Sequence, residues 1–216
     1  MKKAFLSAAI AVAALAGSAN AAVLYSNAWD GTGNAFSSQN DTTAGGFGNF
    51  ATCYGFFSTG RETWSVEDVH FVGAYFNPPA QGNITGFTVN VYGDAGNVPG
   101  ALLSSTVVGV GGFTETFIGI DPIGDPSFHY DMNLTPTLVS GDAWISIVPD
   151  VAFPPQWGWS TGVDGDPAHA AWQVFFGAPS RLAYSLNMDV TGTVVPAPAA
   201  LGLAGLAGLA ATRRRR

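Results

Sequence analysis

The chain has 216 residues, of which 47% are hydrophobic and 11% are charged, and this hydrophobic content excludes a disordered protein. Its 28 Gly and 13 Pro, lying between runs rich in Val, Phe, Ile and Thr, indicate many short strands rather than helices. Between residues 22 and 193 only Arg61 and Arg181 are basic, against fifteen acidic residues, and this excess of thirteen negative charges excludes nucleic-acid binding because it repels phosphate.

A secretion signal is predicted over residues 1–21. Lys2 and Lys3 form a positive n-region, residues 4–17 form an apolar helical h-region, and Ala-Asn-Ala at 19–21 is a small-x-small cleavage site. The apolar run is about 14 residues long, which is shorter than a transmembrane helix needs. We therefore expect export by the Sec translocon and cleavage by signal peptidase.

The segment that follows, residues 28–50, is rich in Gly, Ser, Thr and Asn, and we expect a long loop there. Within it, Asp30-Gly-Thr-Gly-Asn34 places oxygen-bearing side chains at alternate positions. Asp164-Gly-Asp166 has the same spacing later in the chain. Calcium binds six to eight oxygens on flexible loops, so Asp30, Asn34, Asp164 and Asp166 are candidate Ca²⁺ ligands. Ordinary turns are the competing interpretation.

The sequence contains no recognisable catalytic constellation. It lacks a nucleophile elbow, an HExxH helix, a phosphate-binding glycine loop and zinc-ligand spacing. Cys53 is alone, so we interpret it as a buried inert thiol. An acidic cluster beside Trp64 could supply a glycosidase pair, although a solvated face is favoured: Glu62, Glu67 and Asp68. The histidines are scattered and are interpreted as structural or surface residues: His70, His129 and His169. We therefore expect a non-enzymatic protein.

Period-two alternation predicts strands along the central region. It is clearest over residues 87–92, 128–135 and 182–190, where large apolar residues occupy every second position. Further strands are predicted at 64–76, 101–109, 113–119, 143–148 and 170–176, with turns between them, including one at Ser140-Gly-Asp142. This pattern predicts one all-β domain over residues 22–193, a two-sheet antiparallel sandwich of jelly-roll type.

Two tryptophans near the end of this domain are candidate sugar-binding residues. Trp157 and Trp159 lie two residues apart in an extended segment with Gln156 and Ser160. Flat indoles beside amide and hydroxyl groups suit stacking on sugar rings, whereas the alternative is that they close the end of the sandwich. The remaining tryptophans are assigned mainly to the core: Trp29, Trp64, Trp144 and Trp172.

The last 23 residues, 194–216, form an organised tail. Val195-Pro196-Ala197-Pro198 leads into an Ala/Leu/Gly run over 199–211, and the chain closes on four arginines. The apolar stretch from Val194 to Thr212 is just long enough for a single transmembrane helix. The arginines would hold its end in the cytoplasm, which leaves the domain on the far side of the membrane: Arg213, Arg214, Arg215 and Arg216.

This order of motif, apolar helix and arginine cluster resembles the PEP-CTERM sorting signal. The resemblance implies a Gram-negative bacterium that makes exopolysaccharide, and an exosortase, a membrane cysteine protease, that cuts the tail near the Pro-x-Pro motif. The chain departs from the pattern at Ala197, where the family has glutamate.

A second stretch, residues 84–103, together with 143–147 and 157–159, resembles uncharacterised secreted β-sandwich proteins that often carry such tails. The resemblances imply a transient membrane anchor followed by release to the cell surface or the medium. We expect a matrix protein associated with exopolysaccharide or biofilm. The alternative is a calcium-dependent, lectin-like carbohydrate-binding module.

Overall fold

The computed structural model describes residues 21–164 and 167–196, which form twelve strands and one short 3-10 helix. They are β1 (Ala22–Asn27), β2 (Ala35–Ser37), β3 (Gln39–Asp41), β4 (Gly48–Phe76), β5 (Gly86–Asp94), β6 (Pro99–Gly109), β7 (Phe113–Ile120), β8 (Pro126–Val151), β9 (Gln156–Ser160), η1 (Pro167–His169), β10 (Trp172–Phe175), β11 (Ala178–Arg181) and β12 (Met188–Val195). Within the described residues, all twelve strands belong to one hydrogen-bonded sheet, and only β3 and β8 pair in parallel. The predicted all-β class is confirmed.

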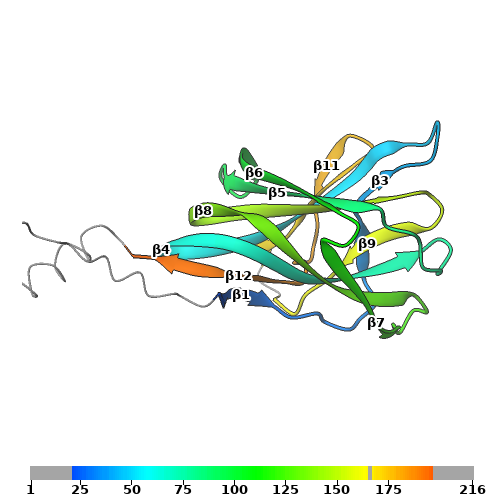
Figure 1. Ribbon diagram of the computed structural model, residues 1–216, viewed down its shortest axis with the longest axis horizontal. Helices are drawn as coiled ribbons and strands as arrows, with labels where there is room; N and C mark the ends of the chain where they lie inside the picture. Colours follow the sequence, from blue (N-terminus) through cyan, green and yellow to red (C-terminus); the bar gives the residue numbers. More distant parts are fainter. Residues whose placement is uncertain (1–20, 165–166, 197–216) are drawn as a thin grey trace, which may run out of the picture.

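Two long strands, β4 and β8, form the centre of this sheet and fold back on themselves (Figure 1). On β4 the rings of Phe57 and Trp64 are stacked with their centroids 6.5 Å apart, whereas seven residues of straight strand would span about 23 Å. The paired strands therefore reverse between these residues, at Gly60 and Gly141, whose φ angles of 63° and 77° suit a tight bend. The segment Ser140-Gly-Asp142, predicted as a turn between two strands, lies within β8 and is the place where this strand bends.

The fold-back divides the sheet into two layers. One layer has the order β11-β10-β4-β8-β5-β6 and uses the first half of β4 with the second half of β8. The other has the order β1-β12-β4-β8-β7 and uses the opposite halves. Strand β9 pairs with the last residues of β4 on one side and with β2 on the other. The result is sandwich-like, and the jelly-roll type remains a prediction.

The core lies between the layers and contains a cluster of aromatic side chains. Phe87 on β5 packs against Phe71 on β4 and Tyr130 on β8, with ring centroids 6.0 Å and 5.5 Å away. Trp157 and Trp159 on β9 also contact Phe71, at 6.2 Å and 5.9 Å. These five side chains are buried, so they join both layers into one hydrophobic core.

Two sequence predictions of local structure are wrong. The segment 28–50 is not one long loop, because β2, β3 and the start of β4 lie within it. The predicted strand 182–190 begins only at Met188, and β12 then continues to Val195. Just before it, the Asn187 amide accepts a hydrogen bond from the Val72 N–H and donates one to the Val72 carbonyl, so a side chain replaces strand pairing there.

Both ends of the described domain lie at the same end of the molecule. Ala22 on β1 is paired with Gly192 on β12, and Val195 is paired with Thr63 beside the fold-back. Figure 1 shows the two strands entering and leaving side by side. The leader over 1–20 and the tail beyond Pro196, with their predicted helices, lie outside the described residues. Within the described ranges, no helix has the length and apolarity to cross a membrane.

Candidate functional site

A polar face covers the outside of the β1-β12-β4-β8-β7 layer. Along β4, Val69 and Phe71 point into the core, while Asp68 and His70 alternate with them and are partly exposed. This is the period-two alternation of a strand with one face in solvent. The sequence therefore builds a core and a polar surface from the same four residues of β4.

Strand register aligns polar residues from five strands into one row. Ser26 is paired with Asp189, Asp189 with His70, His70 with Asp131, and Asp131 with Thr114. Directly opposed residues in antiparallel strands share a face. We call these five residues the polar row.

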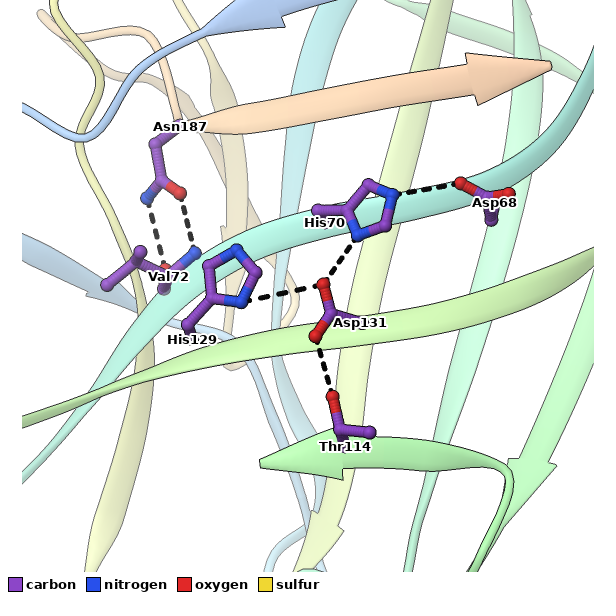
Figure 2. A network of polar contacts seen from close by, with 7 residues as sticks. All are labelled: Asp68, His70, Val72, Thr114, His129, Asp131 and Asn187. Atoms are coloured by element: carbon purple, nitrogen blue, oxygen red, sulfur yellow. Dashed lines mark hydrogen bonds and ion pairs between the residues drawn. The ribbon is translucent and has the colours of Figure 1, made fainter. Parts of the chain in front are cut away.

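His70 lies at the centre of the polar row between two carboxylates (Figure 2). Its Nδ1 is 2.5 Å from Asp131 Oδ1, and its Nε2 is 3.0 Å from Asp68 Oδ1. Both ring nitrogens can donate at once only when the imidazole is protonated. The His129 ring is nearly parallel to the His70 ring at 6.4 Å, and its Nδ1 is 3.5 Å from the same Asp131 oxygen.

Asp131 is the acceptor that joins this network. The Thr114 hydroxyl donates to its second oxygen, Oδ2, at 2.7 Å. Burial alone would raise the pKa of the Asp131 carboxyl, but hydrogen bonds from Thr114 and His70 and the charges of both histidines outweigh burial and lower that pKa. The carboxylate is therefore ionised at neutral pH.

Two shallow cavities flank His70 on this face. One, of about 270 Å³, is lined by Asp68, Asp131, Thr114 and Asn133. The other, of about 210 Å³, is lined by residues that include Trp29, His129 and Asp189. The arrangement offers carboxylate acceptors and imidazole donors to a polar ligand. Within residues 21–164 and 167–196, no three His, Cys, Asp or Glu side chains are placed to hold a metal ion.

A third cavity, which is polar, lies on the outside of the other layer, and sequence reasoning missed it. It has a volume of about 230 Å³ and is lined by Tyr54, Tyr92, Asn90, Asn40 and Asp150 among others. We call this set of five the tyrosine face. Its signal in the sequence was the alternation over residues 87–92, which we interpreted only as a strand.

The rings of the tyrosine face are available to a ligand. Tyr54 and Tyr92 are half-buried, with centroids 5.6 Å apart at 62°. Within the described part of the chain, neither hydroxyl has a hydrogen-bond partner. Burial, and to a smaller extent Tyr92, raises the pKa of Tyr54, so its hydroxyl is a neutral donor at physiological pH. The Asn40 amide donates to Asp150 Oδ1 at 2.7 Å, which fixes a carboxylate at the edge of the cavity.

The predicted sugar-stacking role of Trp157 and Trp159 is wrong. Both side chains are 0% exposed, so neither indole can present a face to a sugar. Their N–H groups are also used internally: Trp157 donates to the Tyr130 hydroxyl at 3.0 Å, and Trp159 donates to the Asn187 carbonyl at 2.6 Å. The alternative, that they close the core, is what the fold requires. Of the other tryptophans, two are buried and two are partly buried: Trp64 and Trp144, then Trp29 and Trp172.

Both oxygens of Asp30, one of the predicted calcium ligands, accept hydrogen bonds from the protein itself. Asp30 Oδ1 accepts hydrogen bonds from the Thr32 N–H and hydroxyl, and its Oδ2 accepts one from Thr161. Asn34 donates to Thr32, which is the pattern of an ordinary polar turn. Asp164 lies 3.8 Å from His169, and Asp166 lies outside the described residues. Calcium binding stays a prediction.

The three acidic residues near Trp64 each contact a different part of the structure. Glu62 accepts the Trp64 indole N–H at 3.1 Å, Glu67 accepts the Thr193 hydroxyl at 3.1 Å, and Asp68 contacts His70. Each of the three carboxylates is therefore engaged by a different structural partner.

The single cysteine is buried, as predicted. Its thiol donates to the carbonyl of Ser37 at 3.2 Å, and burial raises the pKa of Cys53 far above its usual value. A neutral, shielded thiol is unreactive.

The predicted sorting motif overlaps the end of the described domain. Val195 is the last residue of β12 and Pro196 follows it, whereas Ala197, Pro198 and the four arginines lie outside the described residues. No protein-family model matches the chain, and neither does any curated protein.

Proposed function

We propose that the chain is an exported, non-enzymatic protein of the cell surface or extracellular matrix. Its C-terminal PEP-CTERM-like signal would direct its sorting, and the mature protein would be associated with exopolysaccharide or biofilm. The observation that carries the proposal is the pairing of Ala22 with Gly192, because it brings the attachment points of leader and tail to one end of the domain. The jelly-roll type of sandwich is part of the same proposal.

This geometry suits a domain tethered at one end. β1 begins one residue after the predicted cleavage site, and β12 ends at the first residue of the sorting motif. The domain then stands directly on the membrane and projects away from it while the tail is anchored. Its excess of thirteen negative charges keeps copies soluble outside the cell. The partners on this route are the Sec translocon, signal peptidase and an exosortase-type protease.

The test is to determine the location of the protein in its Gram-negative host and the molecular mass of its mature form. We expect the full-length gene product to reach the cell surface or the medium, with a mature N-terminus at Ala22 and the arginines removed. Cleavage is expected beyond Val195, because that residue is paired with Thr63 and a protease needs unpaired backbone. Mass spectrometry of the purified protein measures both ends.

A double variant, Pro196→Ala with Pro198→Ala, is expected to keep its tail, while the same substitution at Pro122, an exposed loop residue, leaves processing unchanged. Uniformly cytoplasmic protein with both ends intact would contradict the proposal.

A second candidate function is carbohydrate binding at the tyrosine face. The specific observation in its favour is the pair of half-buried tyrosines beside amide and carboxylate groups in one cavity. Aromatic rings with polar edges match the apolar faces and hydroxyl groups of sugars. Calcium remains the candidate cofactor, with Asp30 and Asp164 as its first residues to test.

This candidate is tested by retention of the purified exported protein on the host's exopolysaccharide, with calcium and then with chelator. Tyr92→Ala is expected to weaken retention about tenfold, because one stacking ring is lost. Tyr184→Ala, which removes another partly exposed tyrosine outside the tyrosine face, is the matched control. Wild-type retention by the Tyr92 variant, or no retention of the wild type in either condition, would reject this function.

A further inference from the structure

Five phenylalanines gather at the end of the molecule opposite the chain ends. Phe47 and Phe50 come from the β3–β4 hairpin, Phe153 from the β8–β9 connection, and Phe175 and Phe176 from the turn between β10 and β11. Figure 1 shows β3 and β11 at this end, far from the paired ends of β1 and β12. We call this group the aromatic tip.

The rings of the aromatic tip form one continuous cluster. Phe50 lies at its base and is buried, with Phe47, Phe153, Phe175 and Phe176 at centroid distances between 5.3 and 6.3 Å. Phe47 and Phe176 are both 58% exposed, and Phe175 is 39% exposed. Large apolar side chains are therefore collected where water can reach them.

One buried carboxylate holds two of the three loops together. Asp41 Oδ2 accepts the Phe47 N–H at 2.8 Å, and Asp41 Oδ1 accepts the Phe153 N–H at 3.0 Å and the Thr43 N–H at 2.9 Å. Gly46 permits this approach, since a Cβ there would collide with the Asp41 carboxylate.

The third loop is attached by the Phe176 N–H, which donates to the Phe50 carbonyl at 2.6 Å. The aromatic tip is thus preorganised by backbone hydrogen bonds and does not depend on its exposed rings for its shape.

The turn that carries Phe176 imposes an unfavourable backbone conformation on that residue. Phe175 is paired with Ala178, so Phe176 and Gly177 are the two central residues of the hairpin, with φ angles of 46° and 78°. Positive φ at both central positions favours Asn-Gly, and it is costly for a bulky side chain. Phe176 is thus both strained in its backbone and exposed in its side chain. This combination is expected of a residue that contacts a binding partner.

The charge distribution indicates what the aromatic tip contacts. Its loops, 42–50, 152–155 and 173–180, contain no Asp, Glu, Lys or Arg, whereas the rest of the domain carries all fifteen acidic residues. Two copies of the chain, each with an excess of thirteen negative charges, repel each other less where these loops meet, because the Asp41 carboxylate that holds the loops is buried. The tip has no basic residue to attract an anionic lipid surface, and phenylalanine lacks the polar edge that binds sugars.

From these observations we infer that the aromatic tip is a homotypic contact that binds the tip of a second copy of this chain. The same edge-to-face ring pairs that hold the cluster can continue across a two-fold interface. The three exposed rings supply roughly 300 Å² per copy, if a phenylalanine side chain offers about 200 Å². A stable dimer needs about 800 Å² per partner, so the contact is weak in solution and becomes effective where many copies are crowded together.

The test is sedimentation velocity of the exported protein, purified without detergent, from about 10 µM to about 1 mM. The wild type is expected to sediment faster as its concentration rises. The effect should grow with added NaCl, because salt screens the repulsion between acidic bodies.

The decisive variant is Phe176→Asn. It removes an exposed ring but places asparagine where the turn prefers it, so the variant should melt at a higher temperature and lose at least tenfold in self-association. Phe117→Ser is the matched control, because Phe117 is 56% exposed on β7, outside the aromatic tip, and its loss should leave association unchanged.

Three results would overturn the inference. They are a wild-type sedimentation rate that does not depend on concentration, a Phe176→Asn variant that associates like the wild type, and a Phe117→Ser variant that loses association equally. Binding of the wild type, but not of Phe176→Asn, to phosphatidylcholine vesicles without any self-association would assign the tip to a lipid surface instead. Tip association does not depend on sorting by the tail, so failure of either proposal leaves the other standing.

Discussion

Asp41 shows how a single side chain can determine the shape of a distant surface. Burial by itself would raise the pKa of this carboxyl. Hydrogen bonds from the N–H groups of Phe153, Phe47 and Thr43, and from the Thr43 hydroxyl, outweigh burial and lower the pKa to about 2. An ionised carboxylate is thus a fixed part of the fold, and it has this role because backbone donors from two loops converge on it.

Asp41→Asn is expected to destabilise the protein by on the order of 2 kcal/mol at pH 7, because the amide nitrogen cannot accept the Phe47 N–H. The folded pKa lies below the ordinary value of 3.8, so the stabilisation is complete above that value and is lost as the pH falls toward about 2. Urea unfolding of both proteins at pH 7 and near pH 2 measures this. A difference between the two proteins that stays constant over this range would contradict it.

At the scale of elements, the paired strands β4 and β8 dominate the fold. One continuous ladder supplies the centre of both layers, because it reverses at Gly60 and Gly141 instead of ending there. The remaining strands pair either with one half of this ladder or with a strand that does: β3, β5, β7, β9, β10 and β12 pair with it directly, and β1, β2, β6 and β11 pair with one of these. The polar row and the tyrosine face consequently lie on the outer sides of the two layers, with the aromatic core between them.

The fold-back gives a prediction for Gly141. A Cβ at this position would meet nothing within 4 Å, so its φ of 77° is the only obstacle to a side chain. Gly141→Ala is expected to cost about 1 kcal/mol, and Gly141→Asn less, because asparagine tolerates the left-handed region. Chemical denaturation measures both.

Gly93→Ala is the control for this prediction, since Gly93 is equally open but has no positive φ, and it should cost less than Gly141→Ala. Equal costs at the two positions would show that Gly141 is not needed for the bend.

The whole molecule has two unlike ends joined by an acidic body. The chain ends meet at one end, and the aromatic tip closes the other. Thirteen excess negative charges lie on the domain, with few cations to pair them. Self-repulsion of this kind opposes the compact state as well as contact between copies.

Salt should therefore stabilise the domain. Raising NaCl from about 0.01 M to about 1 M shortens the screening length from about 30 Å to about 3 Å, and we expect the melting temperature to rise by several degrees. Differential scanning calorimetry in the presence of chelator separates this effect from cation binding. A melting temperature that falls with salt would show that attractive charge pairs dominate instead.

The alternation of apolar and polar residues was sufficient to predict strands, because a strand with one face in solvent leaves that pattern whatever its partners are. It located β6, β7 and the second half of β4 closely, and it predicted the all-β class. It failed before Met188 because the Asn187 side chain replaces backbone pairing there. It also failed within 28–50, where the short strands β2 and β3 are stabilised by distant partners and not by local pattern.

The sequence by itself therefore determined the class of fold and the charge of the domain, since each of these depends on composition or on local order, and it predicted the burial of Cys53. Only the tertiary structure decided which residues meet. The polar row joins positions 26, 70, 114, 131 and 189, and the aromatic tip joins three loops, because strand register brings them together and no spacing in the chain records it. The same cause reversed the interpretation of Trp157 and Trp159: a platform and a core plug have the same sequence, and only packing distinguishes them.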